Sequence, residues 1–447
     1  MNKDEKFLDK KNSRTLSASK IEATNYILQS VKTGQEFMDK GWMLDAPNEK
    51  EPTLIRAIYE KVQMIPKDIS LGLYRFSDWL PIRRYLSGSS APVTYKSEGL
   101  AKALELSNLY ITFSGYFPEI GANMTTCTFK ETEAYSVCGR LPAEKEGIMV
   151  VASAGNTARA FAKVCSDNNI PLLLCVPEDN LDTLWFDKPI SENVKLFSTC
   201  KGSDYFDSIN LSNIICSIQG FFAEGGAKNV ARRDGMGTTL LSAVDVMKRI
   251  PDYYFQAVGS GTGSIAVWEA NLRLLIDGRF GNNKMKLMVS QNEPFLPMYN
   301  AWKNQSRDII AIDDNESRHQ IEKIYAKVLS NRKPPYSIFG GLYDALKDTD
   351  GTILSATNSE AKTAAELFEK TENIDINPAA AIATATLIRE IKSNNIPKDA
   401  VIMLNITGGG EKRFKQNKEL FYLKPAHVFG ITPTKEEVRD VLLEYYG

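Results

Sequence analysis

Residues 148–157 read I-M-V-V-A-S-A-G-N-T, and this stretch decides the fold. The run I-M-V-V-A-S is a continuous apolar strand of the kind that a parallel sheet buries on both faces. The small residues after it predict a turn that opens a helix ending at about Asn168. A second apolar strand, P-L-L-L-C-V at residues 171–176, follows that helix directly. Strand–helix–strand alternation predicts right-handed crossovers and an open, doubly wound sheet.

The alternation continues toward the C-terminus in two blocks. The first block predicts a helix from Tyr205 to Ile218 between the strands V-K-L-F-S (194–198) and G-F-F-A (220–223). The second predicts a helix from Ile265 to Ile276, later helices over 359–370 and 378–393, and strands at 253–258, 286–290 and 401–406. Residues 292–350 read as irregular and suggest a lid or a partner contact. We therefore expect an α/β protein with two doubly wound, mostly parallel sheet lobes and one shared cleft.

The N-terminal third is less regular. Residues 1 to about 20 are polar and read as a frayed end, and Thr24 to Asp45 predict a small hairpin with its turn at Gly34. Leu54 to Met64 predicts a short amphipathic helix. A helix over 97–106 and a strand over 109–113 then lead to a loop and to the helix that Lys130 begins.

Composition excludes several classes of function. The 447 residues carry 54 basic and 55 acidic side chains, so no excess charge favours nucleic acid or an anionic membrane. Six cysteines without a C-x-x-C pair argue against a zinc ribbon and a secreted disulfide framework. The two histidines, His319 and His427, lie in no motif of a catalytic triad or metal site. Without an apolar leader or membrane span, we expect a cytoplasmic protein.

Lys130 is the first candidate for chemistry. It lies in M-T-T-C-T-F-K-E-T-E (124–133), behind small hydroxylic residues and one aromatic residue, where a loop becomes a helix. The positive end of a helix carries roughly half an elementary charge and favours the neutral amine, which attacks aldehydes. The alternative is an ordinary solvated lysine. We interpret neighbouring Cys127 as a packing residue, because a reactive thiol needs a cation beside it.

Three later segments can bind a flat, phosphorylated ligand. Asn156, in S-A-G-N-T, can bond a ring hydroxyl while the N–H groups of its turn hold a carboxylate; alternatively it only caps the helix. Thr407, before three glycines, can meet a ring nitrogen, unless this segment is only a turn. The third segment can bind a phosphate through its backbone amides, and it comprises Gly259, Ser260, Gly261, Thr262 and Gly263.

A dinucleotide-binding turn is the rival interpretation of the glycine loop. The G-x-G-x-x-G fingerprint fails at its sixth position, which is Ser264. The next strand ends in Ser290 and Gln291 before Glu293, a poor match for the acid that binds a ribose.

Taken in order, these four segments resemble the signature of the fold-type II pyridoxal-phosphate enzymes, which include threonine synthase, cysteine synthase and the tryptophan synthase β chain. The resemblance implies pyridoxal 5′-phosphate in the cleft, with Lys130 forming a Schiff base to its aldehyde. It also implies that Asn156 contacts the 3′-hydroxyl, that Gly259 to Gly263 hold the phosphate, and that Thr407 meets the pyridine nitrogen. A neutral hydroxyl at that nitrogen suits β-elimination and β-replacement better than transamination.

Longer stretches narrow the resemblance. Residues 93–104, 109–122, 127–134, 224–238, 254–263, 331–337 and 340–346 are similar to the cysteate synthase family, which makes L-cysteate from O-phospho-L-serine and sulfite. The similarity covers roughly residues 24 to 425. Two departures stand out. Archaeal relatives carry a C-x-x-C where this chain has Ser30 and Thr33, so we expect no metal there, and Asn377-Pro378 replaces a common Glu-Pro.

An anionic leaving group and an anionic nucleophile require fixed positive charge. Arg159, one helical turn after Asn156, is one candidate. The others lie in A-K-N-V-A-R-R (227–233), which reads as a loop, and are Lys228, Arg232 and Arg233. All four could instead be solvated surface charges. For the substrate carboxylate the candidates are Ser153, Ala154 and Thr157. The resemblance implies that Lys130 removes the α-proton, phosphate leaves the β-carbon, and sulfite adds there.

Alternatives remain open at this stage. Threonine synthase acting on phosphohomoserine and a phosphoserine sulfhydrylase using sulfide differ too little in substrate to be separated by sequence. A Rossmann-like nucleotide-binding module is the non-enzyme alternative. We predict an N-terminal extension over 1–60, a large cofactor-binding lobe from 61–145 and 250–447, and a smaller mobile lobe over 146–249. The resemblance further implies a homo-oligomer, a dimer as is common among relatives. Cysteate can feed sulfonolipid or coenzyme M synthesis in organisms that make them, and the sequence does not indicate which pathway applies.

Overall fold

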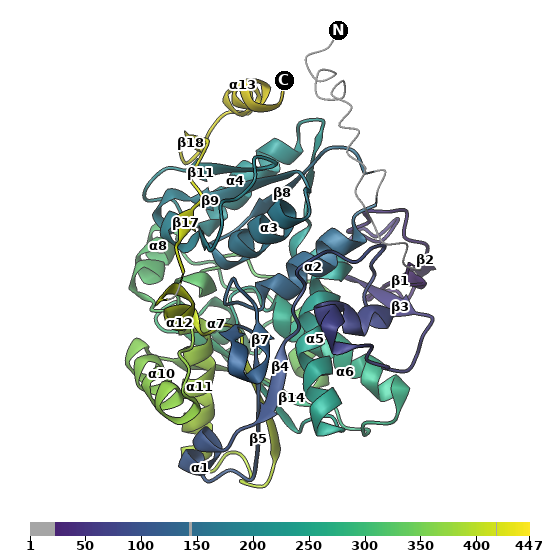
Figure 1. Cartoon of the computed structure of the whole chain (residues 1–447), viewed down its shortest axis with the longest axis vertical. Helices are drawn as coiled ribbons and strands as arrows, with labels where there is room; N and C mark the ends of the chain where they lie inside the picture. The colour runs from purple at the N-terminus through teal and green to yellow at the C-terminus, as the bar shows by residue number, and fades with distance from the viewer. Residues whose placement is uncertain (1–22, 143–144, 417) are drawn as a thin grey trace.

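The computed structural model describes residues 23–142, 145–416 and 418–447 and places them around two mostly parallel sheets (Figure 1). The large sheet has six strands in the order β15-β14-β13-β16-β5-β4, and every neighbouring pair is parallel except β4 with β5. Its strands are β4 (Val93–Lys96), β5 (Asn108–Phe113), β13 (Tyr253–Ala257), β14 (Lys286–Asn292), β15 (Thr352–Ala356) and β16 (Val401–Ile406).

The smaller sheet has five parallel strands in the order β12-β8-β9-β11-β18. They are β8 (Ile148–Ala152), β9 (Leu172–Pro177), β11 (Val194–Thr199), β12 (Phe221–Ala223) and β18 (His427–Phe429). β9 is buried along its whole length, as its unbroken apolar sequence predicts. The predicted α/β class with two mostly parallel sheets is therefore confirmed.

Helices cover these sheets. Those near the candidate site are α2 (Lys130–Arg140), α3 (Asn156–Asp167), α4 (Tyr205–Cys216), α5 (Val230–Met247) and α6 (Thr262–Asp277). Beside the large sheet lie α10 (Asn358–Glu372) and α11 (Pro378–Lys392), both predicted. The remaining described helices are α1 (Gly99–Leu104), α7 (Pro297–Lys303), α8 (Asp314–Lys323), α9 (Leu342–Asp348), α12 (Glu411–Gln416) and α13 (Lys435–Tyr446).

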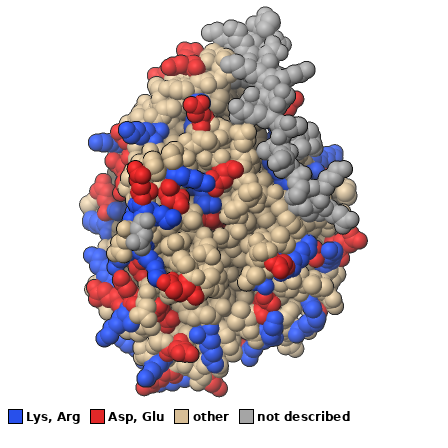
Figure 2. Space-filling view, in the orientation of Figure 1, with Lys and Arg blue, Asp and Glu red and all other residues tan. Residues whose placement is uncertain are grey.

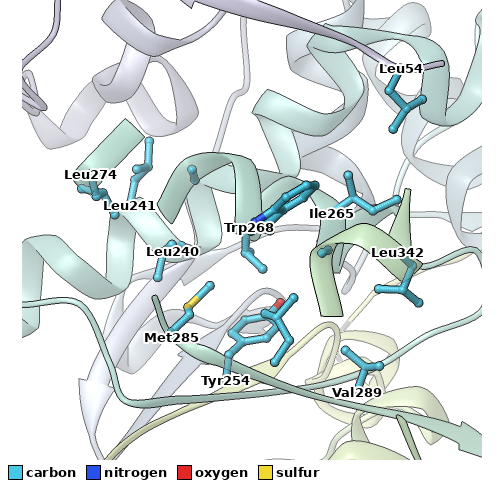
Figure 3. Packing of buried hydrophobic residues seen from close by; sticks show 14 of the residues in the cluster. Leu54, Leu240, Leu241, Tyr254, Ile265, Trp268, Leu274, Met285, Val289 and Leu342 are labelled. Carbon is cyan, nitrogen blue, oxygen red and sulfur yellow. The ribbon is translucent and has the colours of Figure 1, made fainter. Parts of the chain in front are cut away.

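The largest apolar cluster lies between the large sheet and the pair α5 and α6 (Figure 3). Leu240 and Leu241 of α5 meet Trp268 and Leu274 of α6 in this cluster, and Tyr254 of β13 packs beneath them. Burying a side chain of this size contributes about 1.5–3 kcal/mol relative to leaving it in water. This packing fixes the start of α6, where the glycine loop lies, against the large sheet.

The helix predicted over 54–64 is wrong. Residues Ile55–Tyr59 form β3, which pairs antiparallel with β1 (Tyr26–Ser30), and β1 pairs with β2 (Glu36–Phe37) as the predicted hairpin. Ile55, Ala57 and Tyr59 are buried while Ile58 is exposed, so the apolar pattern has the period of a strand.

Two further regions are more regular than the sequence suggests. Residues 292–350 contain α7, α8 and α9, so the expectation of an irregular segment is wrong for these parts. The loop expected over 227–233 is wrong from Val230 onward, because α5 begins there and carries Arg232 and Arg233. Asn229 caps this helix by accepting a hydrogen bond from the N–H of Ala231.

The C-terminal segment returns to the smaller sheet. β17 (Phe421–Tyr422) pairs with β10 (Trp185–Phe186), β18 completes the sheet beside β11, and α13 lies against α4. The last strand, β18, therefore belongs to the smaller sheet, and the last helix, α13, packs on the same side of the molecule through α4. The predicted lobe boundaries remain a prediction. The predicted frayed end, residues 1 to about 20, lies outside the described residues.

The surface mixes charges of both signs on the face seen in Figure 2, with basic and acidic side chains interspersed. In the described ranges no helix is both long and apolar enough to cross a membrane. Ser30 and Thr33, which stand where relatives carry a cysteine pair, both donate hydrogen bonds of 2.7 Å to Glu49. Hydrogen bonds to one carboxylate thus tie this turn to residue 49.

Candidate active site

Lys130 is the first residue of α2, and an unusual turn precedes it. Cys127 has a φ of 53°, a left-handed conformation that non-glycine residues rarely adopt. The Glu131 carboxylate holds the turn by accepting hydrogen bonds of 2.8 Å from the N–H and the hydroxyl of Thr126. Strained backbone that its surroundings hold in place is common at functional sites.

The Lys130 amine lies in a partly enclosed position. Its side chain is 19% exposed, and Nζ lies 3.2 Å from an Oε atom of the fully buried Glu133. Burial lowers the pKa of Lys130 below its usual value; Glu133 raises this pKa and Arg232 lowers it. A lysine with a lowered pKa has a larger fraction of neutral amine, the form that attacks a carbonyl.

The Thr407 segment lies directly beside the lysine turn. Phe129 donates its N–H to the Thr407 carbonyl over 2.9 Å, and Gly409 donates to the Cys127 carbonyl over 3.2 Å. A Cβ atom on Gly408 would lie 2.1 Å from Asn377 Nδ2, so this close approach requires glycine. Asn377, which replaces the common glutamate, caps α11 by accepting a hydrogen bond from the Ala380 N–H.

The Asn156 turn is joined to the same residues through Arg159. The Arg159 guanidinium donates to the Thr126 carbonyl over 2.9 and 3.1 Å, and to Asn156 Oδ1 over 3.2 Å. It also stacks 4.2 Å from the Trp185 ring centroid. Arg159 is therefore a buried cation occupied by backbone carbonyls, and it brings the asparagine side chain next to the turn before Lys130.

Residues at the start of α3 leave backbone donors free. The Ser153 hydroxyl accepts hydrogen bonds from the N–H of Gly155 (2.9 Å) and of Ala158 (3.0 Å). Within the described part of the chain, the N–H groups of Asn156 and Thr157 have no protein acceptor. The Ala154 carbonyl accepts from Asn180 Nδ2 over 2.7 Å. This turn can therefore hold a carboxylate through backbone N–H groups.

The glycine loop lies on the other side of the lysine turn. A Cβ atom on Gly263 would lie 3.2 Å from the Phe129 ring and 2.6 Å from Gln256 Nε2, so the loop packs tightly on both. Gly261 has a φ of 78°, and the hydroxyls of Ser260 and Thr262 are 2.8 Å apart. Four segments that are distant in sequence thus meet around residues 126–130.

The loop also fits a phosphate-bearing cofactor. The Ser264 hydroxyl is buried and has no hydrogen-bond partner in the described structure. It lies in the first turn of α6, a helix of 16 residues whose positive end favours an anion. An unpaired hydroxyl and a helix N-terminus in one loop are the donors that a phosphate group uses.

The basic candidates have different surroundings. Lys228 is a surface residue that pairs with Asp45 over 2.6 Å. Arg233 is fully buried and pairs with Glu269 over 2.8 Å, and it donates to the backbone carbonyl of Ile55. Arg232 is linked to the reactive amine through Glu133. The Glu133 carboxylate lies 3.5 Å from an Arg232 nitrogen and 3.2 Å from Lys130 Nζ.

Two acidic residues of this region were not among the sequence candidates. Glu133 contacts the Lys130 amine, and Glu224 accepts two hydrogen bonds from Arg232, of 2.9 and 2.6 Å. The only signal for Glu133 in the sequence is its position three residues after Lys130 on one helix face. Glu224 lies on a separate segment, and no spacing rule connects it to the lysine.

Comparison with known proteins agrees with this geometry. Residues 121–408 match the family model described as "Pyridoxal-phosphate dependent enzyme", a span that includes Lys130, Asn156, the glycine loop and Thr407. A cysteate synthase of Methanosarcina barkeri is 46% identical over 402 residues, which are 90% of this chain and 96% of the relative. One of Methanocella paludicola is 50% identical over 374 residues, 83% of this chain and 87% of the relative.

Solved structures show the same fold at low sequence identity. Maize serine racemase aligns with a TM-score of 0.56 at 14% identity, covering 73% of this chain and 90% of that chain. Threonine deaminase isoform 2 of Solanum lycopersicum aligns with a TM-score of 0.55 at 15% identity, covering 73% and 86%. At these identities the likeness concerns the fold alone.

Proposed function

The chain belongs to the pyridoxal-phosphate-dependent enzymes, and on this premise we propose that it is a cysteate synthase, which converts O-phospho-L-serine and sulfite into L-cysteate and phosphate. The observation that carries the proposal is the identity of 46% over 90% of the chain with a relative of that name. The nucleotide-binding alternative loses its support, because the glycine loop packs against the turn that leads to the partly enclosed Lys130.

The cofactor would be held by the four converging segments. Lys130 would bind its aldehyde, and Asn156 would hydrogen-bond its ring hydroxyl. The loop from Gly259 to Gly263 would hold its phosphate, and Thr407 would contact its ring nitrogen. When bound, the cofactor withdraws electrons from the substrate and makes the α-hydrogen acidic. The unpaired Ser264 hydroxyl and the tight approach of Gly408 support this placement.

The chain's own groups have distinct tasks in the proposed reaction. Nζ of Lys130 takes the α-proton, and the free N–H groups of Asn156 and Thr157, in the turn shaped by Ser153 and Ala154, hold the substrate carboxylate. Positive charge for the departing phosphate and the incoming sulfite is needed beside the lysine. Of the four basic candidates, Arg232 is the one we assign to this task.

The other basic residues support the site from outside it. Arg159 positions the Asn156 side chain through its bonds to Thr126 and Asn156. Arg233 joins α5 to β3 and α6, and Lys228 stays on the surface. We also propose a cytoplasmic homodimer, and size-exclusion chromatography with light scattering measures the oligomeric state.

Phosphate release tests the proposed reaction. We expect the purified protein to release phosphate from phosphoserine, with cysteate detected by mass spectrometry only when sulfite is present. Lys130→Ala should abolish phosphate release, cysteate formation and the borohydride-sensitive visible absorption. Lys424 is exposed, and Lys424→Ala should leave all three unchanged. Phosphate release from phosphohomoserine but not from phosphoserine would favour threonine synthase, and cysteine formation from sulfide alone would favour a sulfhydrylase.

A further inference from the structure

Four charges of alternating sign, three of them buried, lie in a row that begins at the reactive amine. Lys130 Nζ is 3.2 Å from Glu133, Glu133 is 3.5 Å from an Arg232 nitrogen, and Arg232 is 2.6 Å from Glu224. The side chains of Glu133, Arg232 and Glu224 are 0%, 9% and 4% exposed. Charges this deeply buried are costly unless they are paired, so their arrangement is specific.

Glu133 is bound unequally by its two cations. Its Oε2 atom accepts a hydrogen bond from Lys130, while its Oε1 atom is buried and accepts none, although Arg232 lies 3.5 Å away. Arg232 instead spends its direct hydrogen bonds on both oxygens of Glu224. The lysine therefore holds the only hydrogen bond that Glu133 accepts in the described structure.

The other ionisable groups near this row act elsewhere or are neutral. Tyr205, at the start of α4, faces Arg232, Glu224 and Glu133, and burial raises the pKa of its phenol, which keeps it uncharged. Glu131, on the same helix as Glu133, bonds to Thr126 and lies 3.8 Å from Lys163. The charges that Lys130 meets are thus those of Glu133, Arg232 and, more weakly, Glu224, which also holds Arg232 in place.

We propose that Glu133 and Arg232 set the proton affinity of Lys130 in opposite directions, with Glu133 as the positioning residue that holds the amine and favours its protonated form. This inference rests on the proposed function, in which Lys130 is the reactive amine. Arg232 lowers the proton affinity because it is a second cation that shares the Glu133 carboxylate.

The net charge of this row determines how Glu133 affects the basicity of Lys130. With Lys130 as a neutral amine, the row of Glu133, Arg232 and Glu224 carries a net charge of −1, and the surroundings are buried. When the amine takes the α-proton of the substrate, the C–H bond breaks, Nζ becomes an ammonium group, and the row becomes neutral. Glu133 therefore makes Lys130 a stronger base, and Arg232 ensures that the proton is released again.

A pH titration of the full-length holoenzyme tests the proposal. The visible absorption of the loaded protein reports the protonation of the nitrogen that Lys130 contributes, and it needs no substrate. We expect Glu133→Gln to lower the midpoint by about one pH unit, because it removes the neighbouring anion, and Arg232→Gln to raise it by a similar amount. Asp245→Asn, which removes a carboxylate at the far end of α5, is the matched control and should not shift it.

The rate of α-proton removal is a second measurement on the same variants. With phosphoserine deuterated at the α-carbon, Glu133→Gln should show a larger isotope effect than the unchanged protein, because its base is weaker. Glu133→Asp, which keeps the charge but shortens the side chain, should fall between the two, and it serves where the glutamine variant does not fold. Circular dichroism of each variant establishes that it is folded.

Opposite shifts of the two variants support the proposal, whereas shifts of the same sign, or none, overturn it. The proposed function fails separately. If the titration shifts as expected but no cysteate forms, the charge row holds and the assigned substrates are wrong. If cysteate forms and neither variant moves the midpoint, the reaction stands and Glu133 only packs.

Discussion

Gly408 lies where two segments of the candidate site touch. A Cβ atom there would be 2.1 Å from Asn377 Nδ2 and 2.6 Å from the Cys127 carbonyl oxygen, and a backbone oxygen has no freedom to move aside. We expect Gly408→Ala to destabilise the fold by roughly 1–3 kcal/mol, the usual cost of overpacking, and to weaken cofactor retention. Thermal unfolding and the visible absorption after dialysis measure the two effects.

Gly430 offers a matched control for this substitution. A Cβ atom at Gly430 meets no atom within 4 Å, and its φ is not in the left-handed range. Gly430→Ala should therefore leave both measurements unchanged. Equal behaviour of the two variants would contradict the steric argument for the Thr407 segment.

At the scale of single residues, the sequence predicts candidate site residues best where a loop or strand turns into a helix, because small and polar residues mark such turns. Lys130, Asn156 and the glycine loop all lie where a loop or strand becomes a helix, and the structure brings them around one turn. Glu133 was not a candidate although it lies three residues after Lys130 on α2, because its second ionic contact comes from Arg232 of α5. Glu224 was not a candidate because it meets Arg232 from a separate segment. Burial of an ion pair leaves no mark in local composition.

Among the elements, the segment from α8 to α9 connects the glycine loop with the smaller sheet. A Cβ atom on Gly259 would lie 3.0 Å from the backbone at Val328 and Leu329, so the segment covers the loop. In the same segment, Arg332 donates a hydrogen bond of 3.1 Å to Asp204, the N-cap of α4. Its guanidinium also stacks 4.6 Å from the Phe206 ring centroid. This part of residues 292–350 therefore joins the glycine loop to the start of α4, while a lid or a partner contact stays a prediction.

Arg332→Ala tests this bridge. Loss of a charged hydrogen bond and a stacked ring at a side chain only 6% exposed should cost roughly 1–3 kcal/mol. Hydrogen–deuterium exchange should become faster at the start of α4 and in residues 327–333. Arg249→Ala removes an exposed pair with Asp252 and should change stability by less than about 1 kcal/mol. A bridge without a structural role would give the same exchange rates in both variants.

Elements with one strong period were predictable, and short ones were not. Residues 148–177 alternate as buried apolar strands around one amphipathic helix, which is why β8, α3 and β9 were found. β3 was mistaken for a helix because five residues hold too few repeats to separate a period of 2 from one of 3.6. Arg232 was expected in a loop because α5 is buried nearly all round and lacks an amphipathic pattern.

Across the whole molecule, a salt bridge and a buried hydrogen bond attach the N-terminal sheet to the helices α5 and α6 beside the large sheet. Arg56 of β3 pairs with Glu269 of α6 over 3.0 Å, and the Tyr59 hydroxyl donates to Asp234 of α5 over 2.5 Å. Sequence separations of 175 and 213 residues put these pairs beyond any local pattern. The two mostly parallel sheets could be predicted from alternation, and the division into lobes stays a prediction. No local pattern predicts the contacts that join the N-terminal sheet to α5 and α6.

Asp277, at the end of α6, makes this attachment dependent on pH. Its carboxylate accepts hydrogen bonds from the Met64 N–H over 2.6 Å and from Arg279 over 2.7 Å. Burial raises the pKa of Asp277, but the bonds from Arg279 and Met64 outweigh burial and hold this pKa below its usual value. A carboxyl with a lowered native pKa stabilises the fold fully above its unfolded pKa of about 4, and this contribution is lost as pH falls through the native value.

We therefore expect Asp277→Asn to lower the melting temperature at pH 7, where the native carboxylate is ionised and bonded. As pH falls below about 4, toward the lowered native pKa of Asp277, the difference between the variant and the unchanged protein should shrink, and it should vanish once the native carboxylate is also protonated. Melting curves from pH 3 to pH 8 measure this difference. A constant difference across that range would mean that Asp277 acts through shape and hydrogen bonding alone, and that its charge contributes nothing to holding the N-terminal sheet on α6.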